Sequence, residues 1–214
     1  ILPVEQLCEQ LRQRGIPTCI DGPHALLQQS FKLPQLTCDF YTASCHKWLC
    51  SPLGSGWVYI APKWHEQVVS TRLSWGRLEP AKPTSWSEEL LWTGTRDYSA
   101  YLTVPHAIGF FQSFDSARLD ERNHTLASYA REQLLLLPGA QPVTPAGREW
   151  FGWMVAVVLP AGDHATLQQR LWRDYHIEVP IVHFGDRWLV RVSCHLYNTA
   201  ADIDRLVCAL DVEL

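Results

Sequence analysis

The sequence predicts an α/β protein with a mostly parallel sheet, followed by a small α+β domain. Two observations lead to this prediction. In the first third of the chain, short apolar runs alternate with helix-like or turn-like stretches, as in α/β folds whose sheets are parallel. From about residue 150 the order becomes strand, helix, two strands and helix, which is typical of a small α+β domain.

One helix and three strands are expected in the first part of the chain. Residues 3–14 place Val4, Leu7 and Leu11 on one helical face, and Gly15 is suited to end that helix. The three expected strands lie in the runs "IPTCID", "CDFYTASCH" and "SGWVYIA". Residues 71–92 have no hydrophobic periodicity, which predicts a long loop, and such loops are often functional.

Two helices and a second domain are expected in the remainder. Residues 96–114 and 115–137 have helical patterns, and Pro105 is expected to kink or delay the first of them. Later features are a buried strand over 150–160, a helix capped by Asp163, a hairpin around Gly185-Asp186 and a closing helix over 199–214. We therefore expect a large domain over 1–140 and a small one over 141–214.

Composition excludes several classes of function. The chain has 214 residues, a net charge of −4 and seven cysteines without a CxxC pair. This charge does not favour nucleic acid or an acidic membrane as a partner, and no apolar run is long enough to cross a bilayer. Scattered cysteines are typical of a reduced, cytoplasmic protein. A metal site built from Cys45, His46 and Cys50 is an unfavoured alternative, because no second cluster accompanies it.

Lys47 is the first candidate for chemistry. It follows a strand-like run in "YTASCHKWLCSPLGSG", and ligands of open α/β sheets bind beyond the carboxyl ends of strands. A partly desolvated lysine amine can form a Schiff base with an aldehyde. The alternative is an ordinary solvated lysine, which is the commoner case.

Asp21 ends the preceding strand in "CIDGPHALLQQS", and His24 follows three residues later. A carboxylate at this place could hold a proton on an aromatic ring nitrogen, as pyridoxal phosphate requires. His24 could hydrogen-bond the phenolic oxygen of that cofactor. The alternative for Asp21-Gly22-Pro23 is a simple turn.

Candidate binding groups surround these residues. Ser44 and His46 flank Lys47 with donors suited to a phosphate. Thr95, in "WTGTRDYSAY", precedes an expected helix whose N-terminal amides could hold a phosphate, with an N-cap at Thr95 or Asp97 as the alternative. Arg191 lies inside an expected strand, where it could receive a carboxylate or face solvent.

Together these motifs resemble the class V aminotransferase family, which includes the cysteine desulfurases, and in particular its isopenicillin N epimerase-like branch. The resemblance is carried by "IDGPHA", "SCHKW", "TGTRDYSAYLTVPHAI" and "RVSCHLYNTAADIDRL", in that order. It covers nearly the whole chain, and "SCHKW" together with "TGTRD" is its most specific part.

The resemblance implies the fold-type-I architecture of pyridoxal-phosphate enzymes and a role for each candidate. Lys47 would be the Schiff-base lysine, Asp21 the partner of the pyridine nitrogen and His24 the contact of the phenolic oxygen. Ser44 and His46 would hold the phosphate. Thr95 would reach the cofactor phosphate of a neighbouring subunit, which implies a homodimer. Arg191 would receive the α-carboxylate of an amino-acid substrate.

The resemblance also implies that the chain is the C-terminal portion of a longer enzyme. Family members carry a further N-terminal portion that contributes to cofactor binding, so we expect this chain alone to be inactive or nearly so. Epimerisation, transamination and C–S bond cleavage stay open as reactions. A desulfurase is disfavoured because Cys194 is expected within a strand and Cys208 on a helix, rather than on a mobile loop. The alternative is a non-catalytic remnant or a subunit that needs a partner chain.

Overall fold

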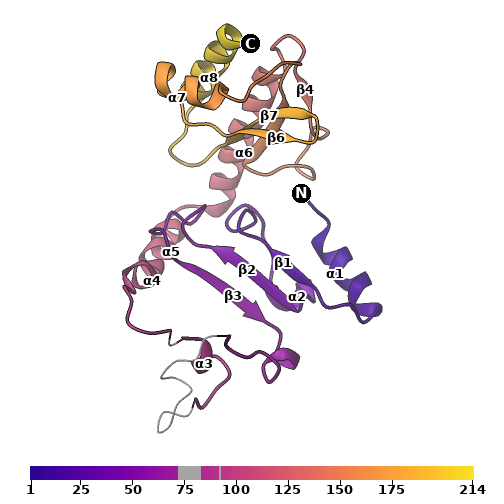
Figure 1. Cartoon of the computed structure of the whole chain (residues 1–214), viewed down its shortest axis with the longest axis vertical. Coiled ribbons are helices and arrows are strands. Elements are labelled where there is room, and N and C mark those ends of the chain that lie inside the picture. The colour runs from indigo at the N-terminus through magenta and orange to yellow at the C-terminus, as the bar shows by residue number, and fades with distance from the viewer. Residues whose placement is uncertain (72–82, 92) are drawn as a thin grey trace. The chain divides into compact units, whose positions relative to one another are not determined.

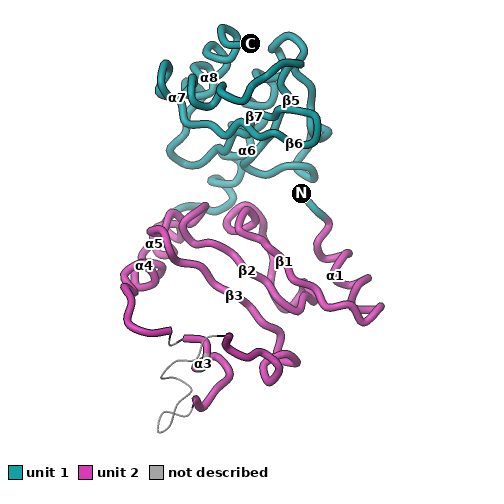
Figure 2. Tube along the Cα trace, in the orientation of Figure 1, with its two compact units in different colours: residues 1–2, 114–214 teal, residues 3–113 magenta. Residues whose placement is uncertain are grey.

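The computed structural model describes residues 1–71, 83–91 and 93–214. These residues form two compact units, which are coloured separately in Figure 2. We call Pro3–Ser113 the N-terminal unit, and Ile1–Leu2 with Phe114–Leu214 the C-terminal unit. Each unit has its own sheet and hydrophobic cluster, and each is described by itself.

The N-terminal unit is built on a three-stranded sheet in the order β1-β2-β3 (Figure 1). β1 is parallel to β2, and β3 runs antiparallel to β2, so the described sheet is mixed and contains one parallel pair. The elements of this unit are α1 (Val4–Gln13), β1 (Cys19–Asp21), α2 (Leu33–Leu36), β2 (Phe40–Ser44), β3 (Gly56–Ile60), the 3-10 turn η1 (Pro62–Trp64), α3 (Glu88–Leu91), α4 (Ser99–Leu102) and α5 (Val104–Gln112).

Helix α1 ends as its sequence predicts. Gly15 has a φ of +69°, a conformation that suits glycine. Its N–H donates to the carbonyl of Arg12, and the Ile16 N–H donates to the carbonyl of Leu11. This pair of bonds is a Schellman motif, which satisfies carbonyls left open at the end of a helix.

The break between α4 and α5 confirms the effect expected of Pro105. α4 ends at Leu102, and Pro105 lies in the first turn of α5, where its missing N–H costs nothing. Most of the loop predicted over residues 71–92 lies outside the described residues, namely 72–82 and 92.

The C-terminal unit contains a four-stranded antiparallel sheet in the order β4-β5-β7-β6. Its elements are α6 (Ser116–Leu134), β4 (Gln141–Pro142), β5 (Met154–Val158), α7 (Leu167–Tyr175), β6 (Ile181–Phe184), β7 (Arg187–Ser193) and α8 (Ala200–Glu213). The hairpin predicted around Gly185-Asp186 is confirmed by the pairing of β6 with β7. The α+β order predicted for the end of the chain is therefore correct.

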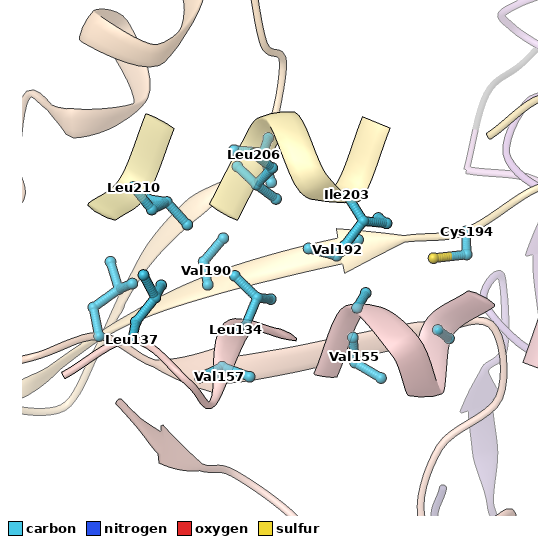
Figure 3. Close-up of a cluster of buried hydrophobic side chains, with 14 of the residues drawn as sticks. Leu134, Leu137, Val155, Val157, Val190, Val192, Cys194, Ile203, Leu206 and Leu210 are labelled. Carbon is cyan, nitrogen blue, oxygen red and sulfur yellow. The ribbon is translucent and has the colours of Figure 1, made fainter. Parts of the chain in front are cut away.

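A core of apolar side chains joins the helices of this unit to its sheet. Figure 3 shows side chains of α8 facing those of the strands. Residues of this core with no exposed surface include Leu134, Val157, Leu171, Val190 and Leu210. Helix α6 thus packs with the C-terminal unit, and the domain boundary expected at residue 140 stays a prediction for the complete enzyme.

The expected cap at Asp163 is wrong. α7 begins at Leu167, and Thr166 occupies its N-cap position. Asp163 instead accepts a hydrogen bond from the Ala165 N–H at 3.0 Å and closes a turn before the helix. Aspartate stabilises both arrangements through the same type of bond, so composition alone does not distinguish them.

Candidate active site

The parallel pairing of β1 with β2 brings the first candidate residues together. Asp21, the last residue of β1, pairs with Thr42, and β2 ends two residues later at Ser44. The carboxyl ends of both strands therefore lie at one edge of the sheet. The loops that follow carry His24 from β1, and His46 and Lys47 from β2.

The turn after β1 is fixed against β2 by Gly22. Its N–H donates to the carbonyl of Thr42 at 2.9 Å, and its own carbonyl accepts from the Tyr41 hydroxyl at 3.2 Å. A Cβ atom at this position would lie 1.9 Å from the Tyr41 oxygen. Only glycine fits here, and the backbone contact sets where Asp21 ends its strand, with its side chain exposed.

The turn after β2 exposes Lys47 because its neighbours are buried. Trp48 and Leu49 are each 5% exposed and anchor the turn, whereas Lys47 is exposed. The backbone closes the turn through a bond from the Cys50 N–H to the Lys47 carbonyl at 3.1 Å. The Cys45 N–H donates to the carbonyl of Ser55 at 3.0 Å. The lysine amine is therefore presented at the carboxyl end of the strand.

A side-chain hydrogen bond joins the two turns. Trp48 Nε1 donates to His24 Nδ1 at 3.1 Å. The two rings meet edge to face, with centroids 6.2 Å apart and planes at 74°. The turn that carries Lys47 is thereby tied to the turn that follows Asp21.

His46 has a buried ring nitrogen, Nδ1, without a hydrogen-bond partner in the described part of the chain. Leaving a buried polar atom unpaired costs free energy, so such an atom is expected to be satisfied by a bound ligand or an ordered water. The chemistry of an exposed lysine amine, Lys47, a carboxylate, Asp21, and this imidazole nitrogen is compatible with the aldehyde, the ring nitrogen and the phosphate of pyridoxal phosphate.

The arrangement of Cys45, His46 and Cys50 does not support the metal alternative. Over residues 1–71, 83–91 and 93–214, no group of three His, Cys, Asp or Glu is placed to hold a metal ion. Burial raises the pKa of the Cys45 thiol, with a smaller opposing effect from its hydrogen bond with Ser55. Burial also raises the pKa of Cys50. Without a metal, both thiols are therefore mainly protonated at neutral pH.

Thr95 lies in the N-terminal unit, but its expected place at a helix N-terminus is wrong. The next helix, α4, begins at Ser99 and spans only four residues. Tyr98 occupies the N-cap position of α4 without a side-chain cap, and the Asp97 carboxylate accepts from the Ser99 N–H at 2.8 Å in the turn before it. Thr95 is exposed, and its proposed contact with a phosphate rests on the family motif alone.

Arg191 lies in the C-terminal unit, within β7, where it pairs with Ala156. Its side chain is half-buried, and its Nε is buried without a partner in the described part of the chain. Burial argues against the alternative of a strand arginine that faces solvent. An arginine with an unsatisfied donor is suited to bind a carboxylate.

Cys194 follows β7 and is fully buried. Burial raises the pKa of its thiol to about 12, which outweighs the opposite effect of the nearby Arg122. A thiol with this pKa carries almost no thiolate at neutral pH and is a poor nucleophile. This agrees with the expectation that Cys194 is not the mobile cysteine of a desulfurase.

Two contributors to the site were missed from the sequence. The sequence patterns assign no role of their own to Trp48, which follows Lys47, or to Tyr41, which lies in an apolar strand. Their contacts with His24 and Gly22 join positions that are distant along the chain. A buried indole N–H or phenol O–H requires a polar partner, and this requirement is the signal that could have identified both residues.

These features define an α/β protein with an exposed lysine and a carboxylate at the ends of adjacent parallel strands. The family model for aminotransferase class-V matches residues 1–206, and the chain belongs to this family. The chain is 38% identical to isopenicillin N epimerase of Amycolatopsis lactamdurans and 37% identical to that of Streptomyces clavuligerus. The alignments cover 98% and 99% of this chain, and 56% of each relative. The chain thus spans little more than half the length of these relatives.

Solved structures support the same fold. The cystine C–S lyase C-DES in complex with cysteine persulfide superimposes with a TM-score of 0.82 at 19% identity, covering 99% of this chain and 57% of that structure. Cysteine desulfurase CsdA of Escherichia coli superimposes with a TM-score of 0.80 at 20% identity, covering 98% of this chain and 54% of that structure. The predicted fold, part of a fold-type-I enzyme, is confirmed.

In the described part of the chain, no helix combines the length and apolar character needed to cross a membrane.

Proposed function

We propose that this chain carries the lysine-bearing part of a pyridoxal-phosphate site that acts at the Cα of an amino acid, with Lys47 as the lysine that bonds the cofactor. The observation that carries the proposal is the position of its exposed amine. Lys47 follows the carboxyl end of β2, beside the parallel strand that ends at Asp21. Membership of the class V family adds the expectation of this cofactor.

Bound pyridoxal phosphate supplies an electron sink that stabilises negative charge at the substrate Cα. Asp21 would hold a proton at the pyridine nitrogen, and Lys47 would remove the proton at Cα as a general base or return it as the conjugate acid. Ser44 and His46 bind the phosphate. Arg191 binds the substrate α-carboxylate through its planar guanidinium.

The homodimer belongs to the same proposal, because Thr95 would bind the cofactor phosphate of a neighbouring subunit. The similarity to isopenicillin N epimerases favours epimerisation, while transamination and C–S cleavage stay open. The cytoplasmic location stays a prediction. Because the chain spans 56% of these relatives, we expect little turnover by the chain alone, and the experiment below does not need turnover.

The test is to add pyridoxal phosphate to the purified chain, record its absorbance, reduce with borohydride and map the labelled peptide. We expect a visible absorbance band and an adduct on Lys47. Lys47→Ala should lose this adduct, because the amine that follows the end of β2 is removed. Lys32→Ala is the matched control, since Lys32 is an exposed lysine in the same unit, and it should retain the adduct.

Two results would contradict the proposal. One is labelling spread evenly over surface lysines, and the other is an unchanged yield of adduct in Lys47→Ala. If the chain shows neither band nor adduct, the experiment is repeated with the N-terminal portion of a relative supplied as a second chain. Absence of a Lys47 adduct in that complex also contradicts the proposal.

A further inference from the structure

The bond between Trp48 and His24 determines which nitrogen of His24 carries a proton. An indole N–H can only donate, so His24 Nδ1 must accept in the 3.1 Å contact. An accepting Nδ1 has no proton, and the neutral ring then carries its proton on Nε2. The contact therefore selects one tautomer out of two.

We propose that Trp48 is a positioning residue that holds His24 as the Nε2–H tautomer, so that the imidazole presents a hydrogen-bond donor to an acceptor oxygen of the bound cofactor. The proposal rests on the proposed function, because it assigns a role to Trp48 within the same site.

Trp48 is suited to this role because it is itself immobilised. It is 5% exposed and follows Lys47 directly, and its ring meets His24 edge to face. The backbone of His24 is held as well, since its carbonyl accepts from Gln28 Nε2 at 2.7 Å. Ring and backbone of the histidine are thus both restrained, one by each turn.

The choice of tautomer matters for an oxygen ligand. A phenolic or phenolate oxygen accepts hydrogen bonds, and an Nε2–H group donates one. The other tautomer would present the Nε2 lone pair, which repels a phenolate oxygen and offers it no hydrogen. Through this bond, Trp48 links the turn that carries Lys47 to the protonation of His24 Nε2, which is the donor offered to the cofactor oxygen.

The first test is nitrogen NMR of the chain labelled with ¹⁵N-histidine, recorded without cofactor at neutral pH. His24 is assigned by the signal lost in His24→Gln. We expect an unprotonated Nδ1 and a protonated Nε2. In Trp48→Phe, which removes the donor and keeps an aromatic ring, both nitrogen shifts should move toward the averaged values of exchanging tautomers.

The matched control is Trp64→Phe. It also removes an indole N–H bond within the N-terminal unit, but that bond is made to Asp39. We expect it to leave the His24 shifts unchanged. A proton on Nδ1 in the unmodified chain, unchanged shifts in Trp48→Phe, or equal changes in both variants would each overturn the proposal.

The second test uses the borohydride-sensitive complex with pyridoxal phosphate. Trp48→Phe should shift its absorbance maximum, because a hydrogen bond to the cofactor oxygen is weakened. In a His24→Gln background the donor no longer depends on Trp48, so the same substitution should add no shift. An equal shift in both backgrounds would overturn the proposal. A chain that shows the expected tautomer but never labels Lys47 would instead contradict the proposed function.

Discussion

The two units differ in what holds them together. The C-terminal unit has a large apolar core in which several side chains have no exposed surface. The buried cluster of the N-terminal unit consists of Cys8, Leu36, Cys38, Tyr41 and Ala43. Two of these five are cysteines, and one is a tyrosine that donates to a backbone carbonyl.

This difference shows where each unit obtains its stability. Apolar burial dominates the C-terminal unit, and its contribution grows with the area removed from water. The N-terminal unit depends more on individual polar contacts, such as those of Gly22 and Asp39. The same unit carries Asp21 and Lys47, so these candidate residues lie in the unit whose structure is more easily disturbed. This arrangement is common, because binding sites often lie in the less stable regions of a protein.

The largest effect is expected in the apolar core. Leu134 has no exposed surface, so Leu134→Ala removes buried methyl groups and leaves a cavity. We expect a loss of about 3–5 kcal/mol in the free energy of unfolding of the C-terminal unit. Denaturant unfolding followed by hydrogen exchange, resolved by peptide, measures the loss in each unit.

Leu136→Ala is the matched control, because it removes the same atoms from the same run of leucines at a position that is 73% exposed. It should change the free energy of unfolding by less than about 0.5 kcal/mol. Equal losses for the two variants would show that the core does not dominate this unit. The difference between the units would then need another explanation.

The next effect concerns a polar contact of the N-terminal unit. Gly22→Ala places a Cβ 1.9 Å from the Tyr41 hydroxyl oxygen, so the turn after Asp21 must move. We expect a loss of about 2–3 kcal/mol in stability and a lower yield of the borohydride adduct at Lys47. Thermal unfolding and peptide mapping give the two readouts.

Gly109→Ala is its control, since a Cβ at Gly109 meets no atom within 4 Å. Gly109 lies within α5, where alanine is favoured by up to about 1 kcal/mol over glycine. This variant should be unchanged or slightly stabilised and should label normally. Normal stability and labelling in Gly22→Ala would show that the contact with Tyr41 is not needed to place Asp21.

Much of the fold could be predicted because local signals and tertiary packing agree. The apolar face of α1 and its terminal Gly15 predict both the helix and its end. The hairpin at Gly185-Asp186 follows from two apolar runs separated by a turn pair. The direction of β3 could not be predicted, since an apolar run such as Gly56–Ile60 suits parallel and antiparallel pairing alike.

The candidate site could be predicted from the sequence only in part, for a different reason. Asp21 and Lys47 could be found because each follows an apolar strand, and parallel strands bring their carboxyl ends to one edge. The link between Trp48 and His24 could not, because it joins two side chains across 24 positions of the sequence. Thr95 is expected from the sequence at the N-terminus of a helix, but the helix begins only at Ser99. Helix boundaries are the least certain part of a sequence pattern.

The smallest of these effects is expected at Asp39, which holds three chain segments together. Its carboxylate accepts from the Thr18 N–H at 2.8 Å and from Trp64 Nε1 at 2.7 Å, and it pairs with Lys63. Asp39→Asn keeps one acceptor oxygen for two donors, so one buried donor loses its partner. We expect a loss of about 1–2 kcal/mol at pH 7. The ion pair itself adds little, because Lys63 is largely exposed.

The effect should depend on pH in a definite direction. Burial disfavours the charged form of Asp39, but hydrogen bonds from Lys63, Trp64 and Thr18 outweigh it and hold the pKa below its ordinary value. The stabilisation is therefore complete above the ordinary carboxyl pKa of about 3.9 and is lost as the pH falls through the lower value in the folded protein. Stability measured between pH 7 and pH 3 should fall less in Asp39→Asn than in the unmodified chain.

Asp186→Asn, at a position whose side chain is 98% exposed, should reproduce the unmodified pH profile. In the unmodified chain, hydrogen exchange should show that the loss attributable to Asp39 is confined to the N-terminal unit. An acid-induced loss that is the same in both units, or unaffected by Asp39→Asn, would mean that this carboxylate does not hold the unit together. Of the polar contacts of Gly22 and Asp39, only that of Gly22 with Tyr41 would then contribute to the stability of the N-terminal unit.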